Sequence, residues 1–363
     1  MKKIALTLLL LSACALAQPL RPVVGQDETI TATSSDDLYT LGRHYRLGLE
    51  HLAFANNLAI SLAPVGPTQL VLPRRRVLPA NPPTDGLVLN LPERGIFLFK
   101  EGKFKAFYPV AVGSPDRQTP VGEYKIIVRT VNPTWLPPEW AGISEPVGPG
   151  PENPLGDRWM GLSRPGYGIH STNSPSSIGG AVSHGCIRMY PELARELFER
   201  VKVGMPVRIE YEPVKLGWDE EQCELYLCVL PDMYGKVNLM AEAERKLAEV
   251  GATDLVDPTR LKVLVDRASG KAEKLAGGRV LVRVDGNESR PPGLIREGRL
   301  WVGTELLEQL GVVPGEELPT VTLASHRLMP VADVLPRYGY TPVWENGSLR
   351  VERVKMDSPP LTD

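Results

Sequence analysis

Apolar residues near the start of the chain recur at intervals of three and four positions. The residues that carry this pattern are Leu38, Leu41, Tyr45, Leu49, Leu52 and Leu58. Such intervals place apolar side chains on one face of an α-helix. We therefore expect two short helices, broken near Gly48, followed by a strand over residues 69–73 that ends at Pro73.

After residue 86 the apolar runs become short and are bounded by proline and glycine, which is typical of strands. One helix is expected after Pro191, with Leu193 and Leu197 on its apolar face. The proline-rich segment 135–154 has no period, so we expect a long surface loop there. The pattern predicts a β-rich domain over residues 86–211, joined to the first helices by a stiff linker over residues 80–85.

The last third of the chain is expected to hold a connector and a β-rich accessory domain. Asn238 is a suitable N-cap and Gly251 a suitable end for a helix, so residues 212–257 are interpreted as a connector with one helix. Residues 258–356 return to short strand-like runs, and two stretches starting at Arg299 and Arg327 look alike. They resemble stalk-like modules of exported bacterial enzymes. The predicted fold class is therefore mainly β with α additions.

Composition excludes several function classes. At roughly 150 residues per domain, 363 residues suggest two or three domains. The 41 lysines and arginines are balanced by 43 aspartates and glutamates without a basic stripe, so a nucleic-acid partner is not expected. No segment after the first residues is long and apolar enough to span a membrane.

The first seventeen residues have the features of a signal peptide. Lys2 and Lys3 precede a short apolar run over residues 4–11, and a small-x-small cleavage pattern ends at Ala17. Residues 11–14 also resemble a lipoprotein box, in which Cys14 is the acylated residue and lipid anchor. Either interpretation predicts an exported protein of the periplasm or cell wall.

The candidate chemistry lies between residues 168 and 189. His170, His184 and Cys186 fall together in a chain that has only five histidines. A thiol becomes a nucleophile when a base takes its proton or when a positive charge such as Arg188 favours the thiolate. Gly185 leaves room beside the thiol for substrate, and main-chain N–H groups near it are expected to hold an oxyanion. The arrangement indicates acyl transfer through a thioester.

This segment resembles the signature of the YkuD-type L,D-transpeptidase catalytic domain. The resemblance is carried by residues 183–188, by His170 upstream, and by the Thr-Pro-x-Gly turn at residues 119–122. It implies that Cys186 is the nucleophile, that His170 is the general base, and that the main-chain carbonyl of Ser171 orients the imidazole. His184 and Arg188 are expected to shape the site and bind substrate carboxylates, and main-chain N–H groups near Gly185 and Cys186 to hold the oxyanion.

The family resemblance also implies a substrate and a product. The donor is a peptidoglycan tetrapeptide stem that loses its terminal D-Ala, and the product is a cross-link between the third residues of two stems. Carbapenems are expected to acylate the same cysteine. Two alternatives remain open: an L,D-carboxypeptidase, in which water resolves the thioester, and a non-catalytic glycan-binding wall scaffold.

Residues 27–79 resemble a LysM module, which binds glycan strands of peptidoglycan. The resemblance rests on residues 37–41, 48–52 and 56–57 and on the closing strand at residues 70–73. A small α/β unit with two amphipathic helices explains the same leucines without sugar binding.

No metal or organic cofactor is implied. The alternative is a zinc site, since His170, His184 and Cys186 are ligand types, and Cys223 and Cys228 have an allowed ligand spacing. Cys223 and Cys228 are otherwise expected to form a local disulfide or two partly buried thiols.

Overall fold

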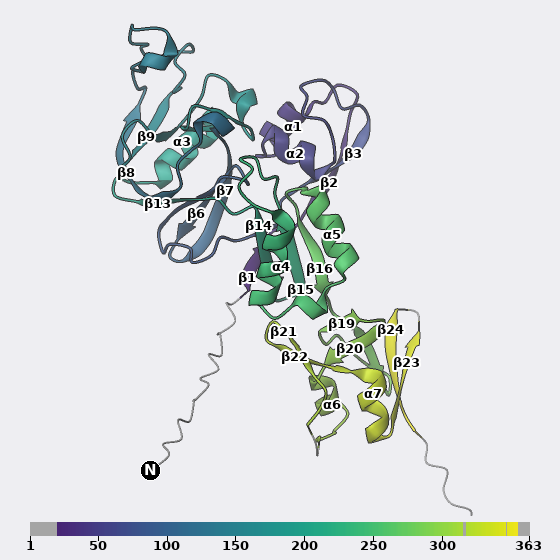
Figure 1. The fold of residues 1–363 in the computed structure, drawn as a ribbon. Helices are drawn as coiled ribbons and strands as arrows, with labels where there is room; N and C mark the ends of the chain where they lie inside the picture. Colours follow the sequence, from purple (N-terminus) through teal and green to yellow (C-terminus); the bar gives the residue numbers. More distant parts are fainter. Residues whose placement is uncertain (1–19, 315–316, 346, 355–363) are drawn as a thin grey trace, which may run out of the picture.

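The computed structural model describes residues 20–314, 317–345 and 347–354. The expected signal peptide and the alternative anchor at Cys14 lie outside these residues. Figure 1 shows a β-rich domain and a small N-terminal module side by side, a central sheet with two helices beneath them, and a separate C-terminal domain beyond that sheet. None of the helices formed by the described residues is long and apolar enough to cross a membrane.

The N-terminal module, residues 28–72, contains two helices and a two-stranded antiparallel sheet. Its elements are β2 (Glu28–Ala32), α1 (Leu38–His44), α2 (Leu49–Ala55) and β3 (Thr68–Leu72). The side chain of Asp37 caps α1 by accepting from the Thr40 N–H at 2.8 Å. Leu38, Leu52 and Leu70 are buried in its core. The expected pair of helices, with the break at Gly48, is confirmed.

The β-rich domain, residues 86–210, is a nine-stranded sheet that closes on itself. Its strands are β5 (Gly86–Asn90), β6 (Gly95–Lys100), β7 (Lys103–Gly113), β8 (Gly122–Val131), β9 (Arg158–Leu162), β10 (Gly168–His170), β11 (Ala181–Ser183), β12 (Ile187–Met189) and β13 (Pro206–Glu210). The order is β11-β7-β12-β10-β9-β8-β13-β5-β6, and closure comes from pairing of β6 with β7. Helix α3 (Pro191–Arg200) begins at the expected proline and buries Leu193 and Leu197 against the sheet.

The central sheet combines strands from distant parts of the chain. Its order is β16-β15-β14-β1-β4, with bounds β1 (Arg21–Val24), β4 (Arg76–Val77), β14 (Val214–Asp219), β15 (Glu224–Val229) and β16 (Ala272–Gly277). Helices α4 (Leu239–Glu249) and α5 (Pro258–Arg267) pack their apolar faces on it.

Residues 212–257 therefore differ from the expected connector. They contribute two long strands as well as α4, and α5, placed with the accessory region by the sequence, belongs to the same core. The difference arises because β14 pairs in parallel with β1, so that Arg21 lies opposite Gly217. A pairing over such a separation leaves no local pattern in the sequence.

The C-terminal domain, residues 281–353, consists of two four-stranded sheets, in agreement with the β-rich expectation. The first sheet contains β17 (Leu281–Val284), β18 (Asn287–Ser289), β23 (Tyr340–Glu345) and β24 (Ser348–Arg353). The second contains β19 (Gly293–Arg296), β20 (Arg299–Gly303), β21 (Val321–Leu323) and β22 (His326–Pro330). The two similar stretches of sequence both form a strand followed by a short helix, β20 with α6 (Glu305–Gln309) and β22 with α7 (Val331–Val334).

A buried ion cluster lies where the N-terminal module, the β-rich domain and the central sheet meet. Its centre is the carboxylate of Glu93, which is paired with Lys215 of β14 and lies 3.4 Å from Nη1 of Arg76 in β4. Asn90 donates to the same carboxylate at 3.3 Å. His51 of the N-terminal module contacts the main-chain carbonyl of Glu93 at 2.8 Å. Glu93 thus contacts residues of the N-terminal module, the β-rich domain and the central sheet.

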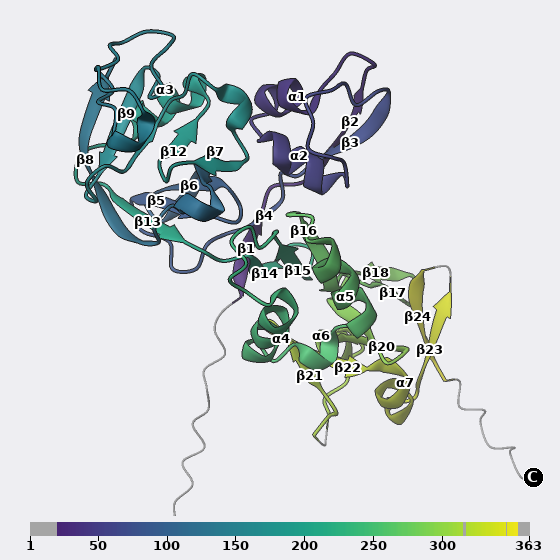
Figure 2. The ribbon, with the colours of Figure 1, turned by 45° about the horizontal axis from the view of Figure 1, so that its top comes forward.

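The N-terminal module also packs directly on the β-rich domain, and both views show the two side by side (Figures 1 and 2). The N–H of Leu49 donates to the carbonyl of Ile178 at 3.1 Å. A Cβ on Gly48 would lie 2.4 Å from the Cα of Gly179, so the two backbones meet where no side chain fits. The Tyr190 hydroxyl donates to the Leu47 carbonyl at 3.1 Å. The module is docked, not suspended on a free linker.

We predict that Lys215→Met, which removes the charge but keeps most of the volume, lowers the free energy of unfolding by about 3 kcal/mol, because it leaves a buried carboxylate with one cation fewer. The matched control is Lys262→Met, since Lys262 forms a solvent-exposed pair with Asp266 at 2.6 Å. The control should change the free energy by less than about 0.5 kcal/mol. Urea unfolding followed by circular dichroism measures both, and equal effects would contradict the prediction.

Candidate active site

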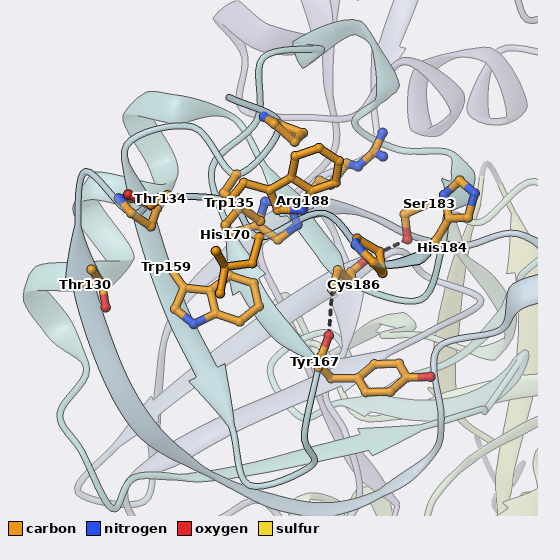
Figure 3. Close-up of a pocket in the computed structure, with 16 residues that line it drawn as sticks. Thr130, Thr134, Trp135, Trp159, Tyr167, His170, Ser183, His184, Cys186 and Arg188 are labelled. Atoms are coloured by element: carbon orange, nitrogen blue, oxygen red, sulfur yellow. Dashed lines mark hydrogen bonds between the residues drawn. The ribbon is translucent and has the colours of Figure 1, made fainter. Parts of the chain in front are cut away.

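Two neighbouring strands bring the predicted base and nucleophile together. Strands β10 and β12 run parallel, with Ile169 opposite Ile187 and His170 opposite Arg188. Cys186 immediately precedes β12. His170, Cys186 and Arg188 line one cavity at this edge of the closed sheet (Figure 3).

The cysteine turn, residues 183–186, is held by hydroxyl groups. Ser183 Oγ donates to the Cys186 carbonyl at 2.6 Å and accepts from the Gly185 N–H at 3.1 Å. Thr119 Oγ1 donates to the Gly185 carbonyl at 2.9 Å and accepts from the Gly113 N–H at the same distance. Sequence reasoning noted Thr119 only as part of a family turn and did not assign it this contact.

Gly185 occupies a conformation that other residues avoid. Its φ is +108°, and a Cβ there would lie 2.8 Å from Cε1 of Tyr167. Its N–H already donates to Ser183, so it is not free for the oxyanion contact expected from the sequence. The N–H of Cys186, the next residue along the turn, remains as a main-chain donor for the expected oxyanion.

His170 is buried and fixed in one orientation. Nδ1 donates to the carbonyl of Ser171 at 2.5 Å, which leaves Nε2 unprotonated in the neutral ring. The ring centre lies 5.7 Å from that of Trp159. Burial, and then the charge of Arg188, lower the pKa of His170 to about 4, while the carbonyls of Ser171 and Leu155 oppose the shift.

Burial shifts the pKa of the thiol in the opposite direction, although it favours the neutral form of both groups. It raises the pKa of Cys186, against the smaller lowering effects of the Gly168 N–H and Arg188. Sγ donates to the Gly166 carbonyl at 3.4 Å. Arg188 favours the thiolate as the sequence predicts, but burial outweighs it, so the thiol and His170 are both neutral at neutral pH.

A cavity of about 650 Å³ opens over these groups. His170, His184, Cys186 and Arg188 line it, together with Tyr167 and residues of the 132–157 loop. The His184 side chain is exposed, and in Figure 3 it lies on the other side of Cys186 from His170. The long loop expected over residues 135–154 therefore forms one wall of the cavity.

The apolar wall was not predicted residue by residue. Trp135, Leu136 and Pro138 of the loop, with Trp159 of β9, form much of it. Tyr167 was also missed, although it lies close to Gly185. The sequence does show Trp135, Trp159 and several prolines before His170. Residue type alone does not tell whether such side chains line a cavity or fill a core.

Among the residues that the structure describes, no group of three or more His, Cys, Asp or Glu side chains is placed so that it could hold a metal ion such as zinc. Cys223 and Cys228 are buried free thiols that belong to two different apolar clusters. Cys223 immediately precedes strand β15 and Cys228 lies within it, far along the chain from the cavity.

Comparison with known proteins identifies the family. The family model "YkuD: L,D-transpeptidase catalytic domain" matches residues 84–209. The probable L,D-transpeptidase ErfK/SrfK of Escherichia coli K12 is 33% identical over 221 residues, covering 56% of this chain and 71% of that protein. The chain belongs to the L,D-transpeptidase family.

Other relatives are similar in extent. The probable L,D-transpeptidase YbiS of Escherichia coli K12 is 32% identical over 206 residues, covering 53% of this chain and 67% of that protein. Among solved structures, that of the catalytic domain from E. faecium L,D-transpeptidase is 25% identical, with a TM-score of 0.30, and covers 35% of this chain and 96% of that one. The names of the ErfK/SrfK and YbiS relatives favour neither the carboxypeptidase nor the wall scaffold.

The pKa of His170 predicts the acid limb of the transpeptidase. If His170 is the general base that the sequence predicts, it must be unprotonated, so kcat/KM should fall only below about pH 4, well under the ordinary histidine value of 6.5. Because Arg188 lowers that pKa, Arg188→Met should move the limb to higher pH, whatever it does to the maximum rate. Turnover of a soluble tetrapeptide between pH 3.5 and 8, with folding checked by circular dichroism, measures both. A wild-type limb near pH 6.5, or a limb that Arg188→Met leaves in place, would contradict the assignment.

Proposed function

We propose that Cys186 is the nucleophile and His170 the general base of this peptidoglycan L,D-transpeptidase. The observation that carries the proposal is the fixed tautomer of His170. Its Nδ1 proton is committed to the Ser171 carbonyl, and so Nε2 is available as acceptor at the edge where Cys186 lies. The cavity over this edge is large enough for a peptide stem.

The proposed reaction begins from a neutral thiol and a neutral imidazole. Nε2 of His170 takes the thiol proton as Sγ of Cys186 attacks the carbonyl carbon between the diamino acid and the terminal D-Ala. The new C–S bond replaces the C–N bond, and the proton passes from His170 to the departing amine. The side-chain amine of a second stem then attacks the thioester. The new C–N bond of the cross-link replaces the C–S bond, and a proton from the attacking amine returns through His170 to the departing sulfur.

Arg188 is proposed to bind a carboxylate of the stem. It lines the cavity, and no ion pair with an acidic side chain is found for it within the described residues. Burial lowers its pKa, and Cys186 partly opposes that shift. A partly buried guanidinium without an acidic partner is suited to an incoming carboxylate. His184, at the exposed side of the thiol, is proposed to contribute to the shape of the entrance.

Replacing the nucleophile tests this site. Cys186→Ala should abolish cross-linking and D-Ala release together, because both require the thioester. The matched control is Cys228→Ala, which removes a buried thiol in the central sheet and should leave turnover within about twofold. Mass spectrometry of products from tetrapeptide stems measures dimers, tripeptides and D-Ala. Turnover by Cys186→Ala above the background without enzyme would refute the assignment.

Carbapenems provide a second measurement of the same residue. As acyl-donor mimics they should add covalently to the wild-type chain and to Cys228→Ala, and not to Cys186→Ala. Intact-protein mass before and after exposure detects the adduct. A mass increase on Cys186→Ala would show that another nucleophile reacts.

The N-terminal module is proposed to be a LysM-like domain that binds glycan strands. Its independent core and its paired helices support this interpretation. A groove of about 280 Å³ lies between the module and residues 176–182 of the β-rich domain. Ile60 and Leu62 line it, are 55% and 59% exposed, and lie beside Ser61, Ser176 and Ser177. Apolar side chains and hydroxyl groups together suit the faces and edges of sugar rings.

Point substitutions test this module better than deletion, because removing residues 18–79 would also remove β1 and β4 from the central sheet. The double variant Ile60→Ser and Leu62→Ser should weaken binding to purified sacculi by roughly tenfold, since two weak contacts lose about 1 kcal/mol or more in total. The control Ile295→Ser alters a side chain that is 69% exposed in the C-terminal domain. If Ile295→Ser weakens binding to sacculi and the double variant does not, the anchor lies in the C-terminal domain.

Export to the periplasm or cell wall is part of the same proposal. It rests on the signal peptide expected over residues 1–17, with acylation at Cys14 as the alternative. Fractionation of cells and the N-terminal mass of the mature chain distinguish the two forms.

A further inference from the structure

One buried amide holds together the loop that forms a wall of the active-site cavity. The loop, residues 132–157, joins β8 to β9, and its two arms meet where Trp135 and Val147 exchange main-chain hydrogen bonds of 2.8 and 2.9 Å. Beyond this pair it contains only one short turn of helix, over residues 139–141. A segment of this length with so little regular structure needs other contacts to keep one shape.

Asn153 supplies those contacts from a fully buried position. Its Nδ2 lies 2.7 Å from the carbonyl of Pro133, 3.2 Å from that of Val147 and 3.1 Å from that of Gly148. Its Oδ1 accepts from the Leu155 N–H at 2.9 Å. The side chain thus bonds to the outgoing arm, the returning arm and the exit of the loop.

A primary amide suits this position because it is both donor and acceptor. The two hydrogens of its NH2 group are shared among three carbonyl oxygens, while its Oδ1 serves the Leu155 N–H, so one short side chain is both donor and acceptor. Without it the carbonyl of Pro133 and the N–H of Leu155 would lose these hydrogen bonds.

The same turn packs against the environment of the proposed base. Gly156 has φ +61°, and a Cβ there would lie 2.6 Å from the side chain of Ser171, the residue whose carbonyl accepts from His170. The carbonyl of Leu155 also acts on His170, because it opposes the lowering of the His170 pKa. Asn153 therefore holds, through the Leu155 N–H, the residue whose carbonyl acts on the imidazole.

We infer that Asn153 is a positioning residue of this L,D-transpeptidase, which fixes the cavity wall against the donor stem and the Leu155–Gly156 turn against His170. It touches no reacting atom. The inference rests on the proposed role of His170, and its consequence is that donor binding depends on a side chain outside the cysteine motif.

The test compares Asn153→Ala and Asn153→Ser with the control Asn173→Ala. Asn173 donates to the Glu152 carbonyl at 3.3 Å from an exposed position, so its loss removes one surface hydrogen bond from the same region. Misplacing substrate by about 1 Å can cost a hundredfold, so Asn153→Ala should lower kcat/KM by at least about tenfold, with a rise in KM. Asn153→Ser, which keeps one small donor, should lose less, and Asn173→Ala should stay within about twofold.

Alkylation of Cys186 by iodoacetamide separates positioning from general disruption. This small reagent needs no cavity wall, so its rate should stay within about twofold in folded Asn153 variants, because thiol reactivity follows thiolate content and exposure. Unchanged kcat and KM in Asn153→Ala would overturn the inference. So would an alkylation rate that falls in parallel with kcat/KM.

His170→Ala, assayed beside these variants, tests the proposed site separately. If it retains wild-type turnover, the proposed general base is wrong. If His170→Ala is inactive and the Asn153 variants are normal, only the positioning role fails.

Discussion

The carboxylate of Glu93 is the constraint on which the arrangement of the molecule depends. A buried carboxylate is costly unless it is paired and hydrogen-bonded, and here Lys215, Arg76 and Asn90 supply the partners. Arg76 also lies over the ring of Phe107, with Cζ 3.4 Å from the ring centre. Because the partners come from β4, from β14 and from the β-rich domain itself, separating these parts would leave charges buried without partners.

This cluster also changes the picture of the N-terminal module. A flexible tether would raise the local concentration of substrate without affecting the site. Here the module is fixed through His51 to the main chain of Glu93, and through Gly48 and Leu49 to residues 178–179. Those residues lead through β11 into the cysteine turn, so the module forms part of the frame that supports the turn. A glycan strand bound at the proposed groove between them would lie beside the segment that carries the proposed nucleophile.

Burial has two electrostatic consequences at the site. It keeps His170 neutral and able to accept a proton at ordinary pH, and it keeps the thiol of Cys186 protonated. A resting thiolate would react with any electrophile that reached it, whereas a thiol that loses its proton only to a correctly placed base reacts mainly with bound substrate. The positive charge of Arg188 adds to burial in lowering the pKa of His170. It opposes burial at Cys186, where it lowers the pKa that burial raises. The depth of the site, set by the loop and by β9, is therefore as important as the identity of the reacting groups.

The sequence by itself determined the features that depend on near neighbours. The spacing of leucines in the N-terminal module, the helix after Pro191 and the run from Ser183 to Arg188 are local patterns, and each predicted its element or its chemistry. Tertiary structure alone decided the central sheet, in which Arg21 pairs with Gly217, and the buried contacts of Thr119 and Asn153. It also decided the state of the thiol, because the sequence shows the positive charge of Arg188 but not the burial that outweighs it. The physical reason is common to these cases: desolvation and strand pairing depend on groups that are distant in sequence and adjacent only in the folded chain.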